Sequence, residues 1–157
     1  MSEGRVVILG LGNLLLQDEG VGVHVAQRLA QMPLPAGVEV AEGGTAPLEA
    51  LTHVENIAKL IIVDAIEADS PPGAVYRLKP ADIAGKEGPW SLHEANLAEA
   101  LTTWQYWGLP LDRVTIFGIV PRVVDWGTQL SLDLAAKLDC FISLILAEVG
   151  KAEESQP

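Results

Sequence analysis

Two carboxylates and one imidazole stand at positions where their side chains could do chemistry together. Glu19 lies in the turn between a first strand-like run and its helix, Asp64 stands where a third apolar run ends, and His93 follows a loop rich in glycine and proline. Oxygen and imidazole ligands in this number suit a borderline divalent metal such as nickel, zinc or iron, and they leave coordination positions open for a substrate. These three residues are the candidate metal ligands.

Each of these residues also has a plain structural interpretation. Asp18 and Glu19 could form a charge pair in the first turn of a helix, where the helix dipole stabilises anions. Asp64 could cap a strand end by accepting backbone hydrogen bonds, and His93 could bond to a loop carbonyl. Because the fold is expected to bring these residues to one edge, the functional interpretation stands level with the structural one, and both stay open at this point.

The pattern of apolar residues predicts how these side chains are positioned. Residues 60–63 are consecutively apolar, which is typical of a strand covered on both faces, and the strand at 75–78 follows it too soon for a parallel crossover. The predicted strands and helices alternate, which favours an α/β fold. The strands are expected at residues 5–9, 37–40, 60–63, 75–78 and 114–120, and the helices from Val21, over 48–54, over 93–107 and after an N-cap at Ser131.

We therefore predict a single three-layer sandwich with a mostly parallel, five-stranded twisted sheet, one antiparallel strand, and helices on both faces. Residues 1–150 form the domain, and residues 151–157 form a solvated tail. Ligands of open α/β sheets bind beyond the carboxyl ends of the strands, where the strand order reverses. With the common order 2-1-3, strands one and three flank that point, and Glu19 and Asp64 face each other there.

Composition excludes several classes of partner. The chain has 157 residues, 49% of them apolar, which suits one domain with a proper core. Its formal net charge of −11 would repel nucleic acid and an anionic bilayer alike. No apolar run approaches the ~20 residues that span a membrane, and there is no charged leader. The single cysteine, Cys140, can build neither an internal disulfide nor a thiolate-rich metal site. We expect a cytoplasmic monomer without membrane insertion.

Other catalytic classes lack their motifs. Residues 10–13 read Gly-Leu-Gly-Asn, but Leu15 stands where the third glycine of a dinucleotide-binding fingerprint belongs. Neither a phosphate-binding P-loop nor a serine nucleophile elbow occurs, so no nucleotide cofactor is expected. Cys140 is interpreted as a packing residue of an amphipathic helix, and His24 and His53 as solvated side chains.

Two tryptophans stand in predicted loops. Trp90 and Trp126 lie beside proline or glycine, where an exposed aromatic side chain can anchor a partner. A packing role for either residue is equally open from the sequence.

The order of five motifs resembles the hydrogenase maturation endopeptidases, which trim the large subunit of nickel-iron hydrogenases. The resemblance covers nearly the whole chain, and the first motif is the most specific. The motifs are GLGNLLLQDEGVG at residues 10–22, GGT at 43–45, IVDA at 62–65, SLH at 91–93 and FGIVP at 117–121. The metal-contacting residues of the family fall on Glu19, Asp64 and His93. One departure is Glu42, because the family often has an aspartate before Gly-Gly-Thr.

The resemblance implies an endopeptidase that removes a C-terminal extension from the precursor of a hydrogenase large subunit after nickel insertion. The nickel would be supplied by that substrate, and the backbone of Gly43, Gly44 and Thr45 would receive the extended peptide. Either Glu19 or Asp64 would act as the general base, as in a carboxylate-dependent, aspartic-type endopeptidase. The resemblance does not say which hydrogenase is processed.

Two alternatives belong to other classes. Residues 10–13 also resemble the start of peptidyl-tRNA hydrolase, but the net charge of −11 and the lack of an early histidine oppose that function. The second alternative is a non-catalytic, nickel-binding accessory protein that checks the assembled site without cutting it. Processing of a precursor by the pure protein would separate the protease from the accessory protein.

Overall fold

The computed structural model describes residues 4–52, 56–84, 90–92 and 96–154. Five strands form the main sheet in the order β2-β1-β3-β6-β4, all parallel except β4, which is antiparallel to β6. A short sixth strand pairs antiparallel with β3 alone. The bounds are β1 Arg5–Leu11, β2 Val38–Gly44, β3 Ile57–Ala68, β4 Val75–Leu78, β5 Trp90–Leu92 and β6 Val114–Ile119. The predicted fold class, the order 2-1-3 and the antiparallel fourth strand are confirmed.

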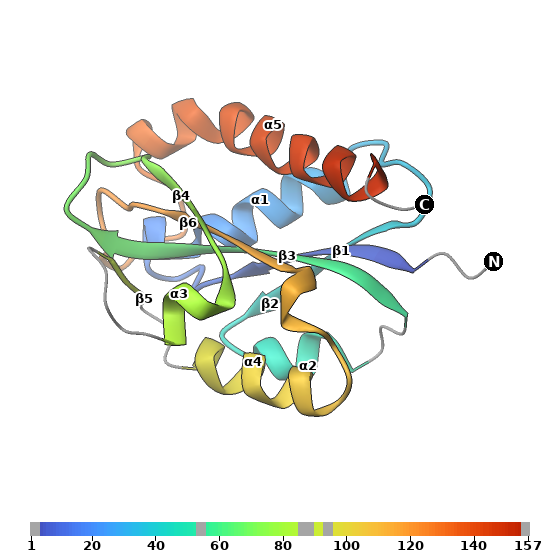
Figure 1. The fold of residues 1–157 in the computed structure, drawn as a ribbon. Coiled ribbons are helices and arrows are strands. Elements are labelled where there is room, and N and C mark those ends of the chain that lie inside the picture. The colour runs from blue at the N-terminus through green and yellow to red at the C-terminus, as the bar shows by residue number, and fades with distance from the viewer. Residues whose placement is uncertain (1–3, 53–55, 85–89, 93–95, 155–157) are drawn as a thin grey trace.

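Helices cover both faces of the sheet (Figure 1). The helices α1 and α5 pack on one face, and α2 and α4 pack on the other. The bounds are α1 Val21–Ala30, α2 Pro47–Ala50, α3 Pro80–Ala84, α4 Asn96–Tyr106 and α5 Leu132–Glu154, with 3-10 turns η1 at Gln17–Gly20 and η2 at Leu111–Arg113. No helix in the described ranges has the length and apolar character that a membrane span requires.

The central strand β3 explains why the fold needs two helical layers. Its residues 60–66 are all buried, and successive side chains point to opposite faces. Ile61 and Val63 join the core beneath α1 and α5, whereas Leu60 and Ile62 join the core beneath α2 and α4. The uninterrupted apolar run in the sequence therefore fills two cores at once.

Some elements differ from those predicted by the sequence. The strand β3 is twelve residues long, and the second helix is only the four residues of α2. The sequence did not predict α3 or β5. The last helix has its predicted N-cap, because the backbone N–H of Leu134 donates to the Ser131 hydroxyl at 3.4 Å. It continues to Glu154, past the predicted end of the domain at 150.

The interpretation of Cys140 as a packing residue is wrong. Its side chain is exposed. The buried stripe of α5 includes Leu134, Phe141, Ile145 and Val149, and position 140 lies about 100° around the helix from 141.

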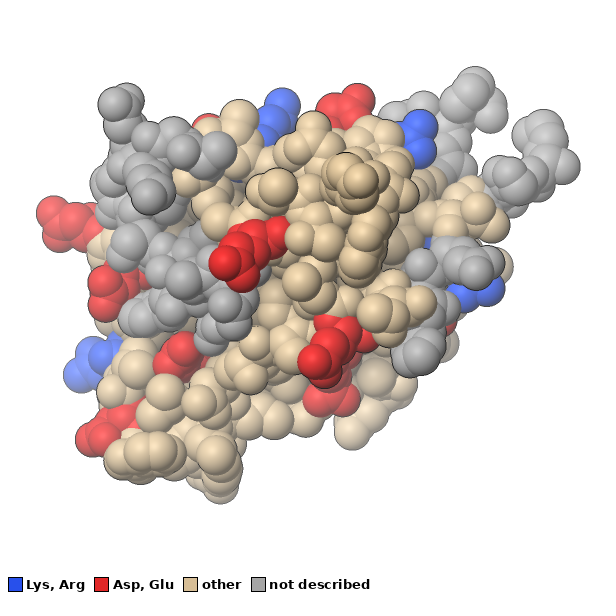
Figure 2. Space-filling model, turned by 90° about the horizontal axis from the view of Figure 1, so that it is seen from below, with Lys and Arg blue, Asp and Glu red and all other residues tan. Residues whose placement is uncertain are grey.

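The face that carries α2 and α4 is largely uncharged (Figure 2). Scattered acidic side chains lie across its described part, and cationic side chains appear only near its margins. This part of the surface therefore presents no basic patch of the kind that nucleic-acid binding needs.

A buried carboxylate fastens α5 to the sheet. Glu148 is 2% exposed and accepts two hydrogen bonds of 2.9 Å from Arg77 on β4, while the Lys59 ammonium on β3 lies 3.0 Å away. The Thr115 hydroxyl on β6 donates to the same carboxylate at 3.5 Å. The Arg77 hydrogen bonds, supported by Lys59, lower the pKa of Glu148 to about 2, although burial acts in the opposite direction.

We expect Glu148→Gln to reduce the free energy of unfolding by about 3 kcal/mol at pH 7, because it leaves two cations without their anion. The folded pKa lies below the ordinary value of 4.5, so this stabilisation is fully present above pH 4.5 and is lost as the pH falls through about 2. Urea unfolding of both proteins at pH 7 and at pH 2 measures this effect. If the free energies of unfolding of the wild type and Glu148→Gln differed as much at pH 2 as at pH 7, the ionised Glu148 would not be the source of the stabilisation.

Candidate active site

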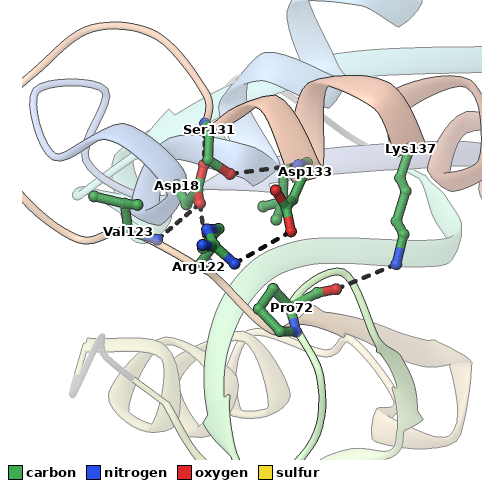
Figure 3. Close-up of polar contacts among 8 residues, drawn as sticks. Asp18, Pro72, Arg122, Val123, Ser131, Asp133 and Lys137 are labelled. Atoms are coloured by element: carbon green, nitrogen blue, oxygen red, sulfur yellow. Dashed lines mark hydrogen bonds and ion pairs between the residues drawn. The ribbon is translucent and has the colours of Figure 1, made fainter.

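Asp18 holds two distant segments of the chain together (Figure 3). It is fully buried in η1, and its carboxylate accepts hydrogen bonds from the backbone N–H groups of Arg122 at 3.0 Å, Val123 at 3.0 Å and Ser131 at 2.7 Å. These bonds fasten the loop between β6 and α5 onto the loop that follows β1. The role of Asp18 is therefore structural, since three backbone donors occupy most of the acceptor positions of its carboxylate.

Glu19 is the neighbouring residue and behaves differently. It is only 7% exposed, yet within the described ranges its carboxylate has no hydrogen bond or ion pair. Buried carboxylates are normally paired, so one left without an internal partner points to a function. The turn η1 that carries Glu19 packs against β3.

Asp64 lies on β3 at the predicted edge of the sheet. Gly10 and Val63 form the last register pair of β1 with β3. Asp64 is therefore the first residue of β3 that no longer pairs with β1. The side chain is fully buried, and its Oδ1 accepts a hydrogen bond of 2.8 Å from the N–H of Ala65. One expectation is wrong: β3 does not end here but continues to Ala68, because its last three residues pair with β5.

Two glycines bring the elements of the site close together. A Cβ on Gly22 would meet the carbonyl oxygen of Val63 at 2.1 Å and that of Leu11 at 2.4 Å, and a Cβ on Gly10 would meet the carbonyl oxygen of Gly22 at 2.2 Å. The helix α1 therefore packs with its backbone against β1 and β3. Gly10 and Gly22 of the first motif therefore serve this close packing of α1 on the sheet.

We expect Gly22→Ala to destabilise the fold by about 3 kcal/mol or more, because a methyl group there overlaps backbone atoms that have no room to move. Gly150→Ala is the control, since a Cβ at this helical position meets nothing within 4 Å. That variant should be neutral or slightly more stable. Thermal unfolding of both proteins tests this, and equal midpoints would disprove the packing argument.

The third predicted ligand, His93, lies outside the described residues. The last described residue before it is Leu92, which pairs with Ile66, two positions beyond Asp64. Among the residues that the structure describes, no three His, Cys, Asp or Glu side chains come together as a metal-binding group. The complete ligand set therefore stays a prediction, and the structure places only Glu19 and Asp64 at neighbouring elements.

The predicted peptide-binding residues line a cleft beside Glu19. The cleft has a volume of about 290 Å³ and is bordered by Gly12, Asn13, Leu14, Val23, Glu42, Gly43, Gly44 and Thr45. A Cβ on Gly12 would meet the carbonyl oxygen of Glu19 at 2.0 Å, so the cleft adjoins the backbone of η1. At Gly44, φ is +53° and a Cβ would meet nothing within 4 Å, so the space above the backbone is open.

Glu42 lies at the rim of this cleft. Its side chain is exposed, and its Oε1 accepts a hydrogen bond of 3.1 Å from the Gln27 amide. Glu42 is thus held by α1 and turned to solvent, unlike the buried Glu19.

The interpretation of His24 as a solvated side chain is wrong. The residue is half-buried, and its Nε2 is buried without a hydrogen-bond partner. Burial lowers the pKa of His24, although the charge of Asp18 acts in the opposite direction. His53 lies outside the described residues.

A second cavity, of about 450 Å³, lies at the opposite end of the strands. Its lining includes Ile57 at the start of β3 and Arg113 just before β6. Trp104 of α4 and Trp107, which follows that helix, also line it. None of the candidate site residues that the structure describes lines it. The cavity is therefore separate from the candidate site, which lies at the carboxyl ends of the parallel strands.

Comparisons with known proteins point to one family. The family model described as hydrogenase maturation protease matches residues 23–148. The hydrogenase 2 maturation protease of Escherichia coli (strain K12) is 33% identical over 154 residues, which cover 94% of this chain and 92% of that protein. The structure of the hydrogenase maturating endopeptidase HybD from E. coli has a TM-score of 0.80 at 31% identity, covering 94% of this chain and 93% of that one.

A second solved structure comes from an archaeon. The [NiFe] hydrogenase maturation protease HybD from Thermococcus kodakarensis has a TM-score of 0.78 at 28% identity, and the match covers 91% of this chain and 97% of that one. The family model begins just after the first glycine-rich motif, whereas the whole-chain matches include it. Because the fold, the motif order and these matches agree over nearly the whole length, the chain belongs to the hydrogenase maturation proteases, a family of peptidases.

Proposed function

We propose that this chain removes the C-terminal extension from the large-subunit precursor of a nickel-iron hydrogenase, after nickel has been inserted. The observation that carries the proposal is the Glu19 carboxylate, which is buried and has no partner among the described residues, on a turn packed against the strand of Asp64. The name of the Thermococcus relative, a [NiFe] hydrogenase maturation protease, supports the choice of substrate. Family membership favours the protease over the non-catalytic accessory protein.

The nickel in this proposal belongs to the precursor. Glu19, Asp64 and His93 would complete the coordination of a metal ion that the substrate already holds. Two carboxylates and one imidazole form a small hard-to-borderline ligand set, which alone holds nickel less firmly than a set containing thiolates. This chain supplies no thiolate at the site, because its one cysteine is exposed on α5.

The precursor tail would lie in the glycine-lined cleft. The strand β2 stands at the edge of the sheet, and its last two residues, Gly43 and Gly44, line the cleft. An extended peptide can add to such an edge through backbone hydrogen bonds, and glycine permits its close approach. Recognition of the metal and recognition of the extended tail would together position the bond to be cut.

Hydrolysis then needs a base for the attacking water. A carboxylate accepts one proton from the water while the water oxygen bonds to the peptide carbonyl carbon. A proton is then delivered to the leaving nitrogen as the C–N bond breaks. Either Glu19 or Asp64 could serve. The contacts favour Glu19, because Asp64 already accepts the Ala65 N–H through one oxygen.

The test is cleavage by the purified protein of a nickel-loaded large-subunit precursor. We expect one cut, which mass spectrometry of both products locates near the C-terminus. A precursor that is bound but left uncut would support the accessory protein and overturn the proposal.

A further inference from the structure

Four large apolar side chains are exposed beside the candidate site. We call them the apolar rim: Leu15 is 54% exposed, Val124 43%, Trp126 76% and Leu132 87%. Leu15 belongs to the loop before η1, and the other three belong to the loop after β6 and the start of α5. Exposed apolar side chains that gather at one place usually mark an interaction surface.

Backbone hydrogen bonds place these four residues together. The N–H of Gly127, next to Trp126, donates to the carbonyl of Leu15 at 2.9 Å. The residues that precede Val124 and Leu132 in the chain both bond to Asp18. Val124, Trp126 and Leu132 are therefore each next in sequence to a residue whose backbone is hydrogen-bonded to residues 15–18.

The apolar rim is held in place before any partner binds. The Asp18 carboxylate takes three backbone N–H bonds from the second loop (Figure 3). The Gln17 side-chain amide donates to the Trp126 carbonyl at 3.2 Å, and the Arg122 guanidinium lies 3.5 Å from Asp133. A surface that is already ordered loses little conformational entropy on binding, which favours affinity.

The apolar rim is continuous with the cleft proposed for the precursor tail. Leu14 lines that cleft, and Leu15, the next residue, belongs to the rim. The loop after β6 carries two exposed charged residues, Asp125 and Arg122, and the Arg122 guanidinium is paired with Asp133. The chain as a whole is strongly acidic. A partner bound here would therefore offer an apolar surface rather than an acidic one.

We propose that the apolar rim is the docking surface for the folded body of the precursor whose tail lies in the cleft, and that Trp126 is its main anchor. The inference rests on the proposed function. The partner surface would be an apolar patch near the cleavage site, outside the extended tail itself. Tryptophan is the residue type that most often dominates such contacts, and this one is carried by a fastened loop.

The test compares Trp126→Ala with Trp107→Ala on the nickel-loaded precursor. Trp107 is a matched control, because it is 61% exposed but lies just after α4, beside the cavity at the opposite end of the strands. We expect Trp126→Ala to raise KM at least about tenfold with kcat nearly unchanged, and Trp107→Ala to leave both unchanged. Leu15→Asp should raise KM in the same way, and thermal midpoints confirm that the variants fold.

Direct binding keeps this inference separate from the proposed function. If the wild-type protein binds the precursor without cutting it, the protease proposal fails, and the docking surface is still supported when Trp126→Ala weakens that binding at least about tenfold. Equal affinity of wild type and Trp126→Ala for the precursor would overturn the docking surface. So would a concentration-dependent dimer, seen by sedimentation, that Trp126→Ala abolishes, because the rim would then be covered by a second copy of the chain.

Discussion

Replacing Glu19 with glutamine, or Asp64 with asparagine, should abolish precursor cleavage while the thermal midpoint barely moves. Each change keeps the size of the side chain but removes the charge that would contact the metal and accept a proton from water. We expect the cleavage rate to fall by about a thousandfold or more. Glu19 has no internal partner to lose among the described residues, so its contribution to folding is small.

The matched control is Asp139→Asn, which removes an exposed carboxylate on α5 that is paired only with Arg28 at 3.4 Å. This variant should cleave the precursor at the wild-type rate, since exposed ion pairs contribute little. Measuring the cleavage rate and the thermal midpoint of each variant separates a catalytic role of the carboxylate from a structural one. If Glu19→Gln still cuts the precursor but melts far below the wild type, Glu19 is a structural residue and the site must be sought elsewhere.

Nickel in the precursor should decide whether cleavage occurs at all. We expect the protein to purify without stoichiometric metal and to bind added nickel weakly, because a complete ligand set would need the substrate's own ligands as well. A nickel-free precursor should stay uncut over a period in which the nickel-loaded one is fully processed. Elemental analysis of the purified protein and gel analysis of the precursor measure these two results.

Chelation provides the control for this prediction. Treating the peptidase with a chelator and then removing the chelator should leave its activity on loaded precursor intact. A peptidase that holds its own metal ion behaves in the opposite way and stays inactive until metal is restored. Rapid cleavage of nickel-free precursor would rule out a role for the substrate's metal, even if Glu19 and Asp64 were both essential.

The sequence predicted the parts of the fold that depend on long apolar patterns. The run at 60–63 predicted a strand covered on both faces, and the short turn before 75–78 predicted an antiparallel strand there. Both predictions are confirmed, although the antiparallel strand pairs with β6 rather than with β3. The sequence also placed Glu19 and Asp64 near one edge, because strand order and loop position follow from topology. The strand β5 was missed because three residues are too few to show a period.

The role of Asp18 could not be read from the sequence. Its partners lie more than a hundred residues away in the chain, and they are backbone N–H groups, which every residue type except proline supplies. Local sequence patterns describe single helices and strands, whereas the hydrogen bonds of Asp18 depend on how the loop between β6 and α5 packs against η1.

The two carboxylates of the site stand on parts of the molecule that should differ in local stability. Asp64 belongs to β3, whose backbone is hydrogen-bonded between β1 and β6 and buried under helices on both faces, so its amides should be among the last to exchange with deuterium. Glu19 stands on a single 3-10 turn whose position depends on the Asp18 carboxylate and on a few loop bonds. On warming, the site should therefore come apart by opening of the turn while the sheet is still intact, so that activity is lost at a lower temperature than the fold.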